Sequence, residues 1–164
     1  QACPGIDPGM ALMGYGVLEG DQGKLQVLDV GVLSTEAGKP PARRLAFLYK
    51  GLSEIIQRHQ PTEVAVETFV GRNLRSALAV GQARGVALLA AAHGGLPVFE
   101  YTPMQVKQVV VGYGRGDKQQ VQEMLKLQLG LTYLPQPDDA ADALAVAFCH
   151  IHLAHISQVL GQGR

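Results

Sequence analysis

Residues 2–34, ACPGIDPGMALMGYGVLEGDQGKLQVLDVGVLS, contain three apolar runs separated by turn-forming residues. The runs cover residues 2–7, 12–18 and 24–33, and each has the length and composition of a β-strand. Pro8-Gly9 turns the chain after the first run, and the cluster Glu19-Gly20-Asp21-Gln22-Gly23 predicts a hairpin turn after the second. Because these connections are short, we expect the three strands to pair as an antiparallel meander.

After residue 34 the pattern alternates between helices and strands. Leu45, Leu48, Leu52 and Ile55 fall on one face of a helix that is expected to begin near residue 40 and to stop before residue 61. Further helices are predicted at residues 73–92, 103–111 and 118–129, and from residue 138 past residue 152, with strands at residues 62–67 and 97–101. These two strands follow helices, so they should pair in parallel. We therefore expect a single α/β domain over residues 1–164, with a mixed five-stranded sheet (antiparallel strands 1–3, parallel strands 4–5) and helices on both faces.

The composition is that of a globular protein, with 47% hydrophobic and 17% charged residues. No apolar stretch is long enough to predict a membrane span, and no signal peptide is visible. The chain has two cysteines, Cys3 and Cys149, which is typical of a protein in a reducing cytoplasm. A formal net charge of zero argues mildly against a nucleic-acid-binding protein. However, six basic and two acidic residues lie between residues 69 and 118, so a local basic face is expected.

Four carboxylates occur where an apolar stretch meets a turn: Asp7, Glu67, Asp139 and Asp142. Hard divalent cations such as Mg²⁺ are bound by carboxylate oxygens, and two such ions can activate a water for phosphodiester hydrolysis. Asp138 leaves an ambiguity, because either Asp138 or Asp139 shares a helix face with Asp142. The alternative is that these acids are ordinary helix-cap or surface residues.

Several other residues are candidates for nucleic-acid contact. Phe69 directly follows the fourth strand, where an aromatic ring can stack on an unpaired base, although it could instead be a core residue. Cations and a second aromatic ring flank a glycine-rich loop at residues 112–116, and they suit phosphate and base contacts or else belong to a solvated turn. The remaining candidates, in the loop and helix that follow Phe69 and around the glycine-rich loop, are Arg72, Asn73, Arg75, Lys107, Tyr113, Arg115 and Lys118.

Two further patterns have alternative interpretations. Gly81 and Gly85 are one turn apart on an alanine-rich helix, which predicts either a dimer interface or tight packing on the sheet. His150, His152 and His155 could suggest zinc, but they lack a Cys or acid that would complete a tetrahedral set, so we interpret them as a polar helix end.

The element order, with acids ending strands one and four and opening the last helix, resembles the ribonuclease H-like nuclease fold. The local sequences resemble the RuvC family of bacterial Holliday junction resolvases. Six motifs carry this resemblance in order along nearly the whole chain: Gly5-Ile6-Asp7-Pro8-Gly9, Gly14-Tyr15-Gly16-Val17, Gly81-Gln82-Ala83-Arg84-Gly85-Val86, Pro97-Val98-Phe99-Glu100-Tyr101, Gln105-Val106-Lys107-Gln108 and Asp139-Ala140-Ala141-Asp142-Ala143-Leu144.

The resemblance implies a homodimeric endonuclease of recombination and repair that cuts two opposed strands of four-way junction DNA. It implies Mg²⁺ or Mn²⁺ as cofactor, with two ions per site, and the RuvA–RuvB branch-migration complex as partner. The family's catalytic acids map onto Asp7, Glu67, Asp139 and Asp142, its junction-contacting aromatic onto Phe69, and its two functional lysines onto Lys107 and Lys118. In this interpretation Asp7 bridges the ions and an activated water attacks the phosphorus.

Two other function classes are compatible with parts of the sequence. An actin-like phosphotransferase or ATPase also places a phosphate-binding turn after an Asp, as in Asp7-Pro8-Gly9, but this chain is short for two such lobes. A non-catalytic junction-binding module, or a relative that cuts RNA–DNA hybrids, would share the fold. The presence of all four acids argues against the inactive version.

Overall fold

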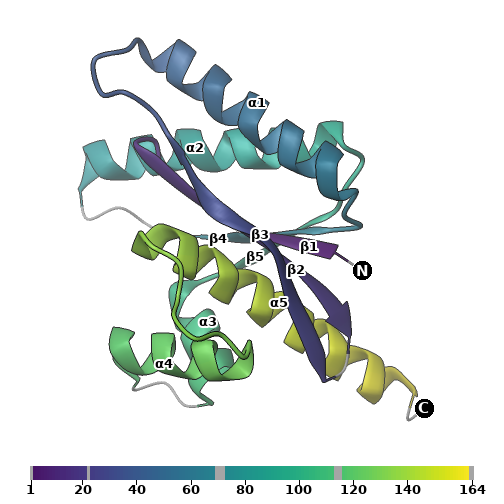
Figure 1. The fold of residues 1–164 in the computed structure, drawn as a ribbon. Helices are drawn as coiled ribbons and strands as arrows, with labels where there is room; N and C mark the ends of the chain where they lie inside the picture. The colour runs from purple at the N-terminus through teal and green to yellow at the C-terminus, as the bar shows by residue number, and fades with distance from the viewer. Residues whose placement is uncertain (1, 22, 69–72, 113–115, 163–164) are drawn as a thin grey trace.

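The computed structural model describes residues 2–21, 23–68, 73–112 and 116–162, and these contain the mixed five-stranded sheet that the sequence predicts. The strand order is β3-β2-β1-β4-β5 (Figure 1). The strands are β1 (Ala2–Asp7), β2 (Leu12–Asp21), β3 (Lys24–Ser34), β4 (Val64–Glu67) and β5 (Val98–Tyr101). The meander β1–β2–β3 is antiparallel, whereas β4 pairs in parallel with both β1 and β5, as expected.

Two strand boundaries differ from the prediction. Asp21 pairs with Lys24, so β2 continues through most of the cluster at residues 19–23, and the predicted five-residue turn is wrong. Gly20, with φ of 140°, lets the strand continue where another residue would be strained. At the other boundary, β4 begins at Val64 instead of residue 62, where the Val64 N–H donates to the Pro97 carbonyl at 3.0 Å.

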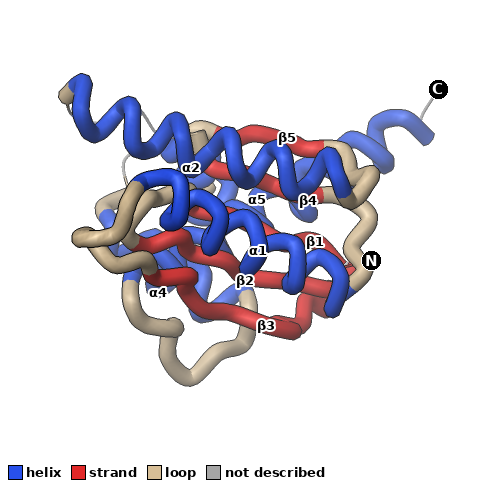
Figure 2. Tube along the Cα trace, turned by 90° about the horizontal axis from the view of Figure 1, so that it is seen from above, coloured by secondary structure: helices blue, strands red, loops and turns tan. Residues whose placement is uncertain are grey.

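Helices cover both faces of the sheet, as predicted. Figure 1 shows α1 (Pro41–His59) and α2 (Leu74–His93) on one face, and α3 (Pro103–Val111), α4 (Lys118–Gln128) and α5 (Asp138–Gln162) on the other. Figure 2, viewed from the side of the first pair, shows α1 and α2 lying over the sheet and running roughly along its strands. One hydrophobic core lies under each layer. Thr102 and Asp117 form complete capping boxes at the starts of α3 and α4.

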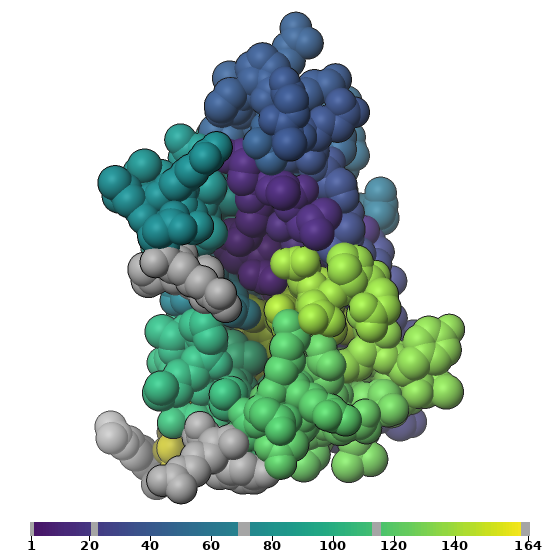
Figure 3. All heavy atoms as spheres, turned by 90° about the vertical axis from the view of Figure 1, so that its left-hand side faces the viewer, coloured from purple at the N-terminus to yellow at the C-terminus, as the bar shows by residue number. Residues whose placement is uncertain are grey.

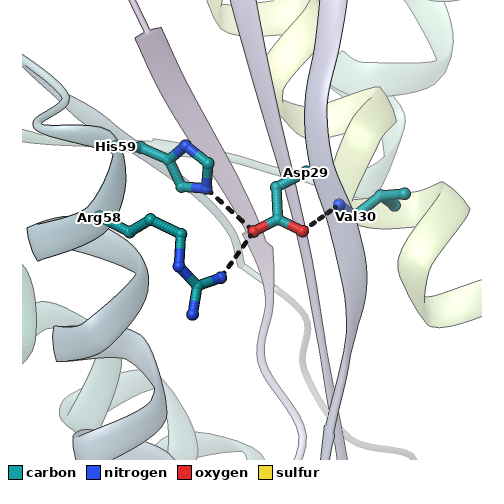
Figure 4. A network of polar contacts seen from close by, with 4 residues as sticks. All are labelled: Asp29, Val30, Arg58 and His59. Atoms are coloured by element: carbon teal, nitrogen blue, oxygen red, sulfur yellow. Dashed lines mark hydrogen bonds and ion pairs between the residues drawn. The ribbon is translucent and has the colours of Figure 1, made fainter.

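A carboxylate on β3 ties the end of α1 to the sheet (Figure 4). Asp29 accepts hydrogen bonds from Arg58 at 3.2 Å and from the Val30 N–H at 2.9 Å, and His59 Nε2 lies 2.9 Å from the same carboxylate. These contacts are distant from the four acids, so they give His59 a structural role.

The helix α5 is the central element of the second core. Between Ala140 and His150 every residue is buried except Asp142, which is half-buried. By length and composition α5 could also span a membrane, contrary to the expectation that no segment would. Its packing on β1 and β2 accounts for that apolar composition, because a core helix that is buried on most sides is apolar on most sides.

Candidate active site

The ends of two neighbouring parallel strands bring Asp7 and Glu67 together. Asp7 is the last residue of β1 and Glu67 is the last residue of β4. Ile6 pairs with Val66, so the next residues, Asp7 and Glu67, lie on neighbouring strands at the same end of the sheet. Both side chains are half-buried. The sequence prediction that these two acids share one site is therefore consistent with the strand register.

Glycines on β1 and β2 let the start of α5 lie directly on this end of the sheet. Gly14 is the Cα partner of Asp7, and a Cβ at Gly14 would stand 1.9 Å from the Asp139 carbonyl oxygen. A Cβ at Gly5 would stand 2.1 Å from the Ala143 carbonyl oxygen. No larger residue fits at either position without displacing the helix. The close approach places the first turns of α5 beside Asp7.

Burial and the charges of neighbouring acids raise the proton affinity of three of the carboxylates, Asp7, Glu67 and Asp142. Burial, followed by the charges of Glu67, Asp142 and Asp139, raises the pKa of Asp7 to about 8. Burial and the charge of Asp142 raise the pKa of Glu67 to about 7, and burial also raises the pKa of Asp142. Charge effects of this kind act only between carboxylates that lie near one another.

The structure shows that Asp138 and Asp139 have different environments, which their spacing in the sequence could not reveal. Asp138 is exposed, forms an ion pair with Lys118 at 2.9 Å and accepts a hydrogen bond from Gln122 at 3.4 Å. The hydrogen bond and charge of Lys118 lower the pKa of Asp138. Asp139, in contrast, is half-buried, and its hydrogen bond and charge contribute to the raised pKa of Asp7. Asp139 is thus the neighbour of Asp7.

The donor set fits a hard divalent cation. All four side chains offer carboxylate oxygens, which are the ligands that Mg²⁺ and Mn²⁺ prefer. In the described ranges no three Asp, Glu, His or Cys side chains stand close enough together to ligate one ion in their present positions. Three of these carboxylates, Asp7, Glu67 and Asp142, nevertheless have pKa values raised by burial and by the charges of neighbouring acids. A bound cation would remove that repulsion, so their chemistry suits a metal.

Lys118 is a cation whose charge acts on this cluster. Its hydrogen bond to Asp138, together with the charges of Asp142 and Asp139, raises the pKa of Lys118. In turn, its charge acts to lower the pKa values of Glu67 and Asp142 against the effect of burial. The structure therefore places the charge of Lys118, which was predicted as a phosphate contact, within reach of the acids.

The other predicted DNA contacts are placed only in part. Asn73 caps α2, where its side-chain oxygen accepts a hydrogen bond from the Ser76 N–H at 3.0 Å. Arg75 is exposed in the first turn of α2, and Lys107 is half-buried in the middle of α3. Four further predicted contacts lie outside the described residues: Phe69, Arg72, Tyr113 and Arg115.

The interpretation of the three histidines as a polar helix end is wrong for His150. Its side chain is only 2% exposed and lies between two polar partners. Nδ1 is 2.6 Å from the Tyr101 hydroxyl and Nε2 is 2.7 Å from a Glu63 carboxylate oxygen. The network joins α5 to the beginning of β4 and the end of β5. His152 and His155 line a cavity of about 720 Å³ at the opposite end of the sheet from the four acids.

Sequence reasoning missed two features of the site. The glycines that seat α5 were quoted only as motifs, although glycine at alternate positions of a strand signals a close backbone approach on one face. A group of cations at the start of α1, made of Lys39, Arg43 and Arg44, also lies at this end of the sheet. The available signal was a helix start that has basic residues and no acid in its first turn.

Comparison with known proteins agrees with this arrangement. The family model described as "Crossover junction endodeoxyribonuclease RuvC" matches residues 3–150. A protein of that name from Chloroflexus aggregans is 58% identical over 158 residues, covering 96% of both chains. Another from Moorella thermoacetica is 56% identical over 151 residues, covering 92% of this chain and 90% of the relative.

A solved structure described as "T. thermophilus RuvC in complex with Holliday junction substrate" superposes with a TM-score of 0.91. It is 37% identical and covers 95% of this chain and 96% of its own. The fold, the order of the four acids and these matches agree along almost the entire sequence. This chain therefore belongs to the RuvC family of crossover junction endodeoxyribonucleases.

Proposed function

We propose that this chain is a metal-dependent endodeoxyribonuclease that resolves four-way DNA junctions by nicking two opposed strands. The observation that carries the proposal is the convergence of four half-buried carboxylates, at which the pKa of Asp7 reaches about 8. The family match and the superposition on a junction-bound relative support the same reaction and substrate. They favour it over the actin-like phosphotransferase that the Asp7-Pro8-Gly9 turn also suggested.

Asp7, Glu67, Asp139 and Asp142 would hold the metal, which we propose to be two ions of Mg²⁺ or Mn²⁺. Bound there, the metal would supply an activated water and stabilise the leaving oxygen of the cleaved phosphodiester. The chain contributes the crowded acids, whose protons leave as the cation binds. Lys118 balances their charge from the side of α4 and, in this proposal, would meet a phosphate oxygen.

Junction binding would use the residues that surround the acids. We propose that Lys107, Lys118 and Arg75 contact the phosphate backbone, and that Asn73 can still donate from its side-chain amide after capping α2. For the predicted contacts outside the described residues, Phe69 and Tyr113 would stack on bases, and Arg72 and Arg115 would meet phosphates. These assignments rest on the sequence.

We further propose that two copies of the chain pair through α2. An apolar stripe on this helix faces solvent, with Leu74, Leu78 and Leu89 exposed by 77%, 60% and 47%. Gly81 and Gly85 continue the stripe, and no atom lies within 4 Å of where their Cβ atoms would stand. Tight packing of these glycines on the sheet is therefore wrong, and a close approach by another helix is open to them.

A two-fold dimer would present two sites to two opposed strands, as symmetric cleavage of a junction requires. Leu78→Asp places a charge in the middle of the stripe and should give a monomer in sedimentation, whereas Leu127→Asp, an exposed leucine on α4, should not. Dimeric Leu78→Asp protein would contradict the interface. We also propose action in the bacterial cytoplasm beside a RuvA–RuvB complex.

Cleavage of a labelled mobile four-way junction tests the function. With Mg²⁺ or Mn²⁺ the protein should make paired, symmetric nicks in the junction and none in a linear duplex or an RNA–DNA hybrid of the same sequence. Asp7→Asn should bind the junction without cutting it. Binding without nicks by the unmodified protein would contradict the nuclease, and equal cutting of the hybrid would contradict the substrate.

A further inference from the structure

A group of three cations lies beyond the acids at the same end of the sheet. Lys39 precedes α1, and Arg43 and Arg44 lie in its first turn. The preceding strand, β3, ends at Ser34, whose Cα partner is Leu12, shortly after Asp7 in the chain. Adjacent strands are about 5 Å apart, and β2 separates β3 from β1, so the end of β3 is about 10 Å from the end of β1.

Figure 3 looks onto this end of the molecule. The start of α1 (blue, top) stands next to the turn that follows β1 (purple), and the first turns of α5 (yellow-green) lie on the other side of that turn. The three segments form one continuous face. An extended ligand that reaches the acids can therefore also reach the start of α1.

The cations at the start of α1 form no ion pair with any residue that the structure describes. Among the residues that the structure describes, none of the ion pairs involves Lys39, Arg43 or Arg44. The first turn of α1 contains no acid, and positive charge there is opposed by the helix dipole. Glu36 is the one carboxylate that lines the same pocket of about 240 Å³. The surface therefore keeps a net positive charge.

Arg44 is held in place from one side only. Its Nε donates to the Thr35 hydroxyl at 2.9 Å, and that hydroxyl donates to the Met10 carbonyl at 2.5 Å. The Thr35 N–H also donates to the Ala11 carbonyl at 2.9 Å, so the guanidinium is anchored to the turn after Asp7. Arg44 also lines the pocket with Lys39 and Arg43. A pre-ordered guanidinium loses little entropy when it forms a bidentate contact with a phosphate.

We propose that Lys39, Arg43 and Arg44 bind the phosphate backbone of one duplex arm of the DNA junction. This inference rests on the proposed function, which it deepens by naming a contact surface. A duplex rises about 3.4 Å per base pair, and the end of β3 is already about 10 Å from the end of β1, so cations beyond β3 would meet phosphates about three or more base pairs from the cut. Arg44 is also hydrogen-bonded through Thr35 to the turn after Asp7. The residues that contact the duplex arm are therefore linked directly to the turn that carries Asp7.

The first test measures how junction binding depends on salt. The double variant Lys39→Gln/Arg43→Gln removes two charges and leaves the anchored Arg44 in place. Lys24→Gln is the matched control, because it removes an exposed lysine at the opposite end of the sheet. Fluorescence anisotropy of a labelled four-way junction without divalent metal gives the dissociation constant from 0.05 to 0.5 M salt, and melting followed by circular dichroism confirms that each variant is folded.

Each phosphate contact contributes about 0.9 to the slope of log K against log salt. The double variant should therefore lower the slope by about two and weaken binding at 0.1 M salt by up to about 60-fold, whereas Lys24→Gln should match the unmodified protein. An unchanged slope in the folded double variant would overturn the proposal.

Neutral methylphosphonates locate the contact. Placed two to five base pairs from the cut, they should weaken binding by the unmodified protein but cause no further loss in the double variant. Equal losses in both proteins would overturn the proposed surface alone. Failure of the unmodified protein to bind or nick any junction would instead overturn the proposed function, and with it this inference.

Discussion

Replacing Asp7 by Asn should stabilise the metal-free protein while it abolishes cleavage. The sign follows from the pKa of Asp7, which is raised from 3.8 to about 8 by burial and by the other acids. An acid whose pKa is higher in the folded state is stabilising below its unfolded pKa, and that stability is lost as the pH rises towards the folded pKa. The loss therefore occurs between about pH 4 and pH 8. Asn does not titrate and escapes it.

The size of the effect follows from the same shift. At pH 7 the carboxyl of the unfolded chain is about three pH units above its pKa. At about 1.36 kcal/mol per unit, its ionisation stabilises the unfolded state by about 4 kcal/mol. This is an upper limit, because the Asn amide must also be desolvated. The amide can still donate to Asp139, as the protonated acid does. We expect a gain of about 1–4 kcal/mol, which is about 2–15 °C in Tm for a chain of this length.

Urea denaturation followed by far-ultraviolet circular dichroism measures this gain, since the chain has no Trp for fluorescence. The difference between Asp7→Asn and the unmodified protein should vanish below pH 4 and grow towards pH 8. Added Mg²⁺ or Mn²⁺ should reduce it, because the metal stabilises the protein that keeps all four acids. Asp138→Asn is the control and should give no gain, since Lys118 lowers the pKa of that acid. A pH-independent difference, or a less stable Asp7→Asn at pH 8, would refute the reasoning.

Three further outcomes are expected. Gly14→Ala should cost several kcal/mol in thermal melting and most of the cleavage activity, because its Cβ would collide with the main chain of α5, whereas Gly38→Ala meets no neighbour and should be near neutral. Tyr101→Phe should lower the free energy of unfolding in urea by about 1–2 kcal/mol, because it leaves buried His150 without one partner; an unchanged value would contradict this. Lys118→Gln should move the rising limb of the pH–cleavage profile to higher pH, because the lysine lowers the pKa values of its neighbouring acids; a profile that stays in place would show that its charge is screened.

The order of elements was predictable because each depends on local patterns. The alternation of apolar runs with turn residues predicted the meander, and the capping boxes at Thr102 and Asp117 show that the starts of α3 and α4 also depend on residues close in the chain. The errors were local too. The turn at residues 19–23 was predicted too long because Glu, Gly and Asp favour turns, whereas pairing with β3 keeps three of these residues in the strand.

The sequence proposed the members of the candidate site but did not show their environment. Resemblance selected Asp139 over Asp138, and the structure gives the physical difference between them: one side chain packs beside Asp7 and the other pairs with Lys118 at the surface. His150 looked like part of a polar helix end, because the residues that enclose it come from β4 and β5 and are far away in the chain.

The sequence alone determined which strands and helices form, the four acids at their ends and the family to which the chain belongs. These follow from side-chain periodicity, turn chemistry and motif order, which are properties of neighbouring residues. Only the tertiary structure decided how closely α5 approaches the sheet and which acids are near enough to raise one another's pKa values. It also decided that the cations at the start of α1 lie on the same face as these acids. Those properties depend on contacts between segments that are distant in the sequence. The space left by the missing Cβ of Gly14 and the hydrogen bond from Arg44 to Thr35 matter only once the chain has folded.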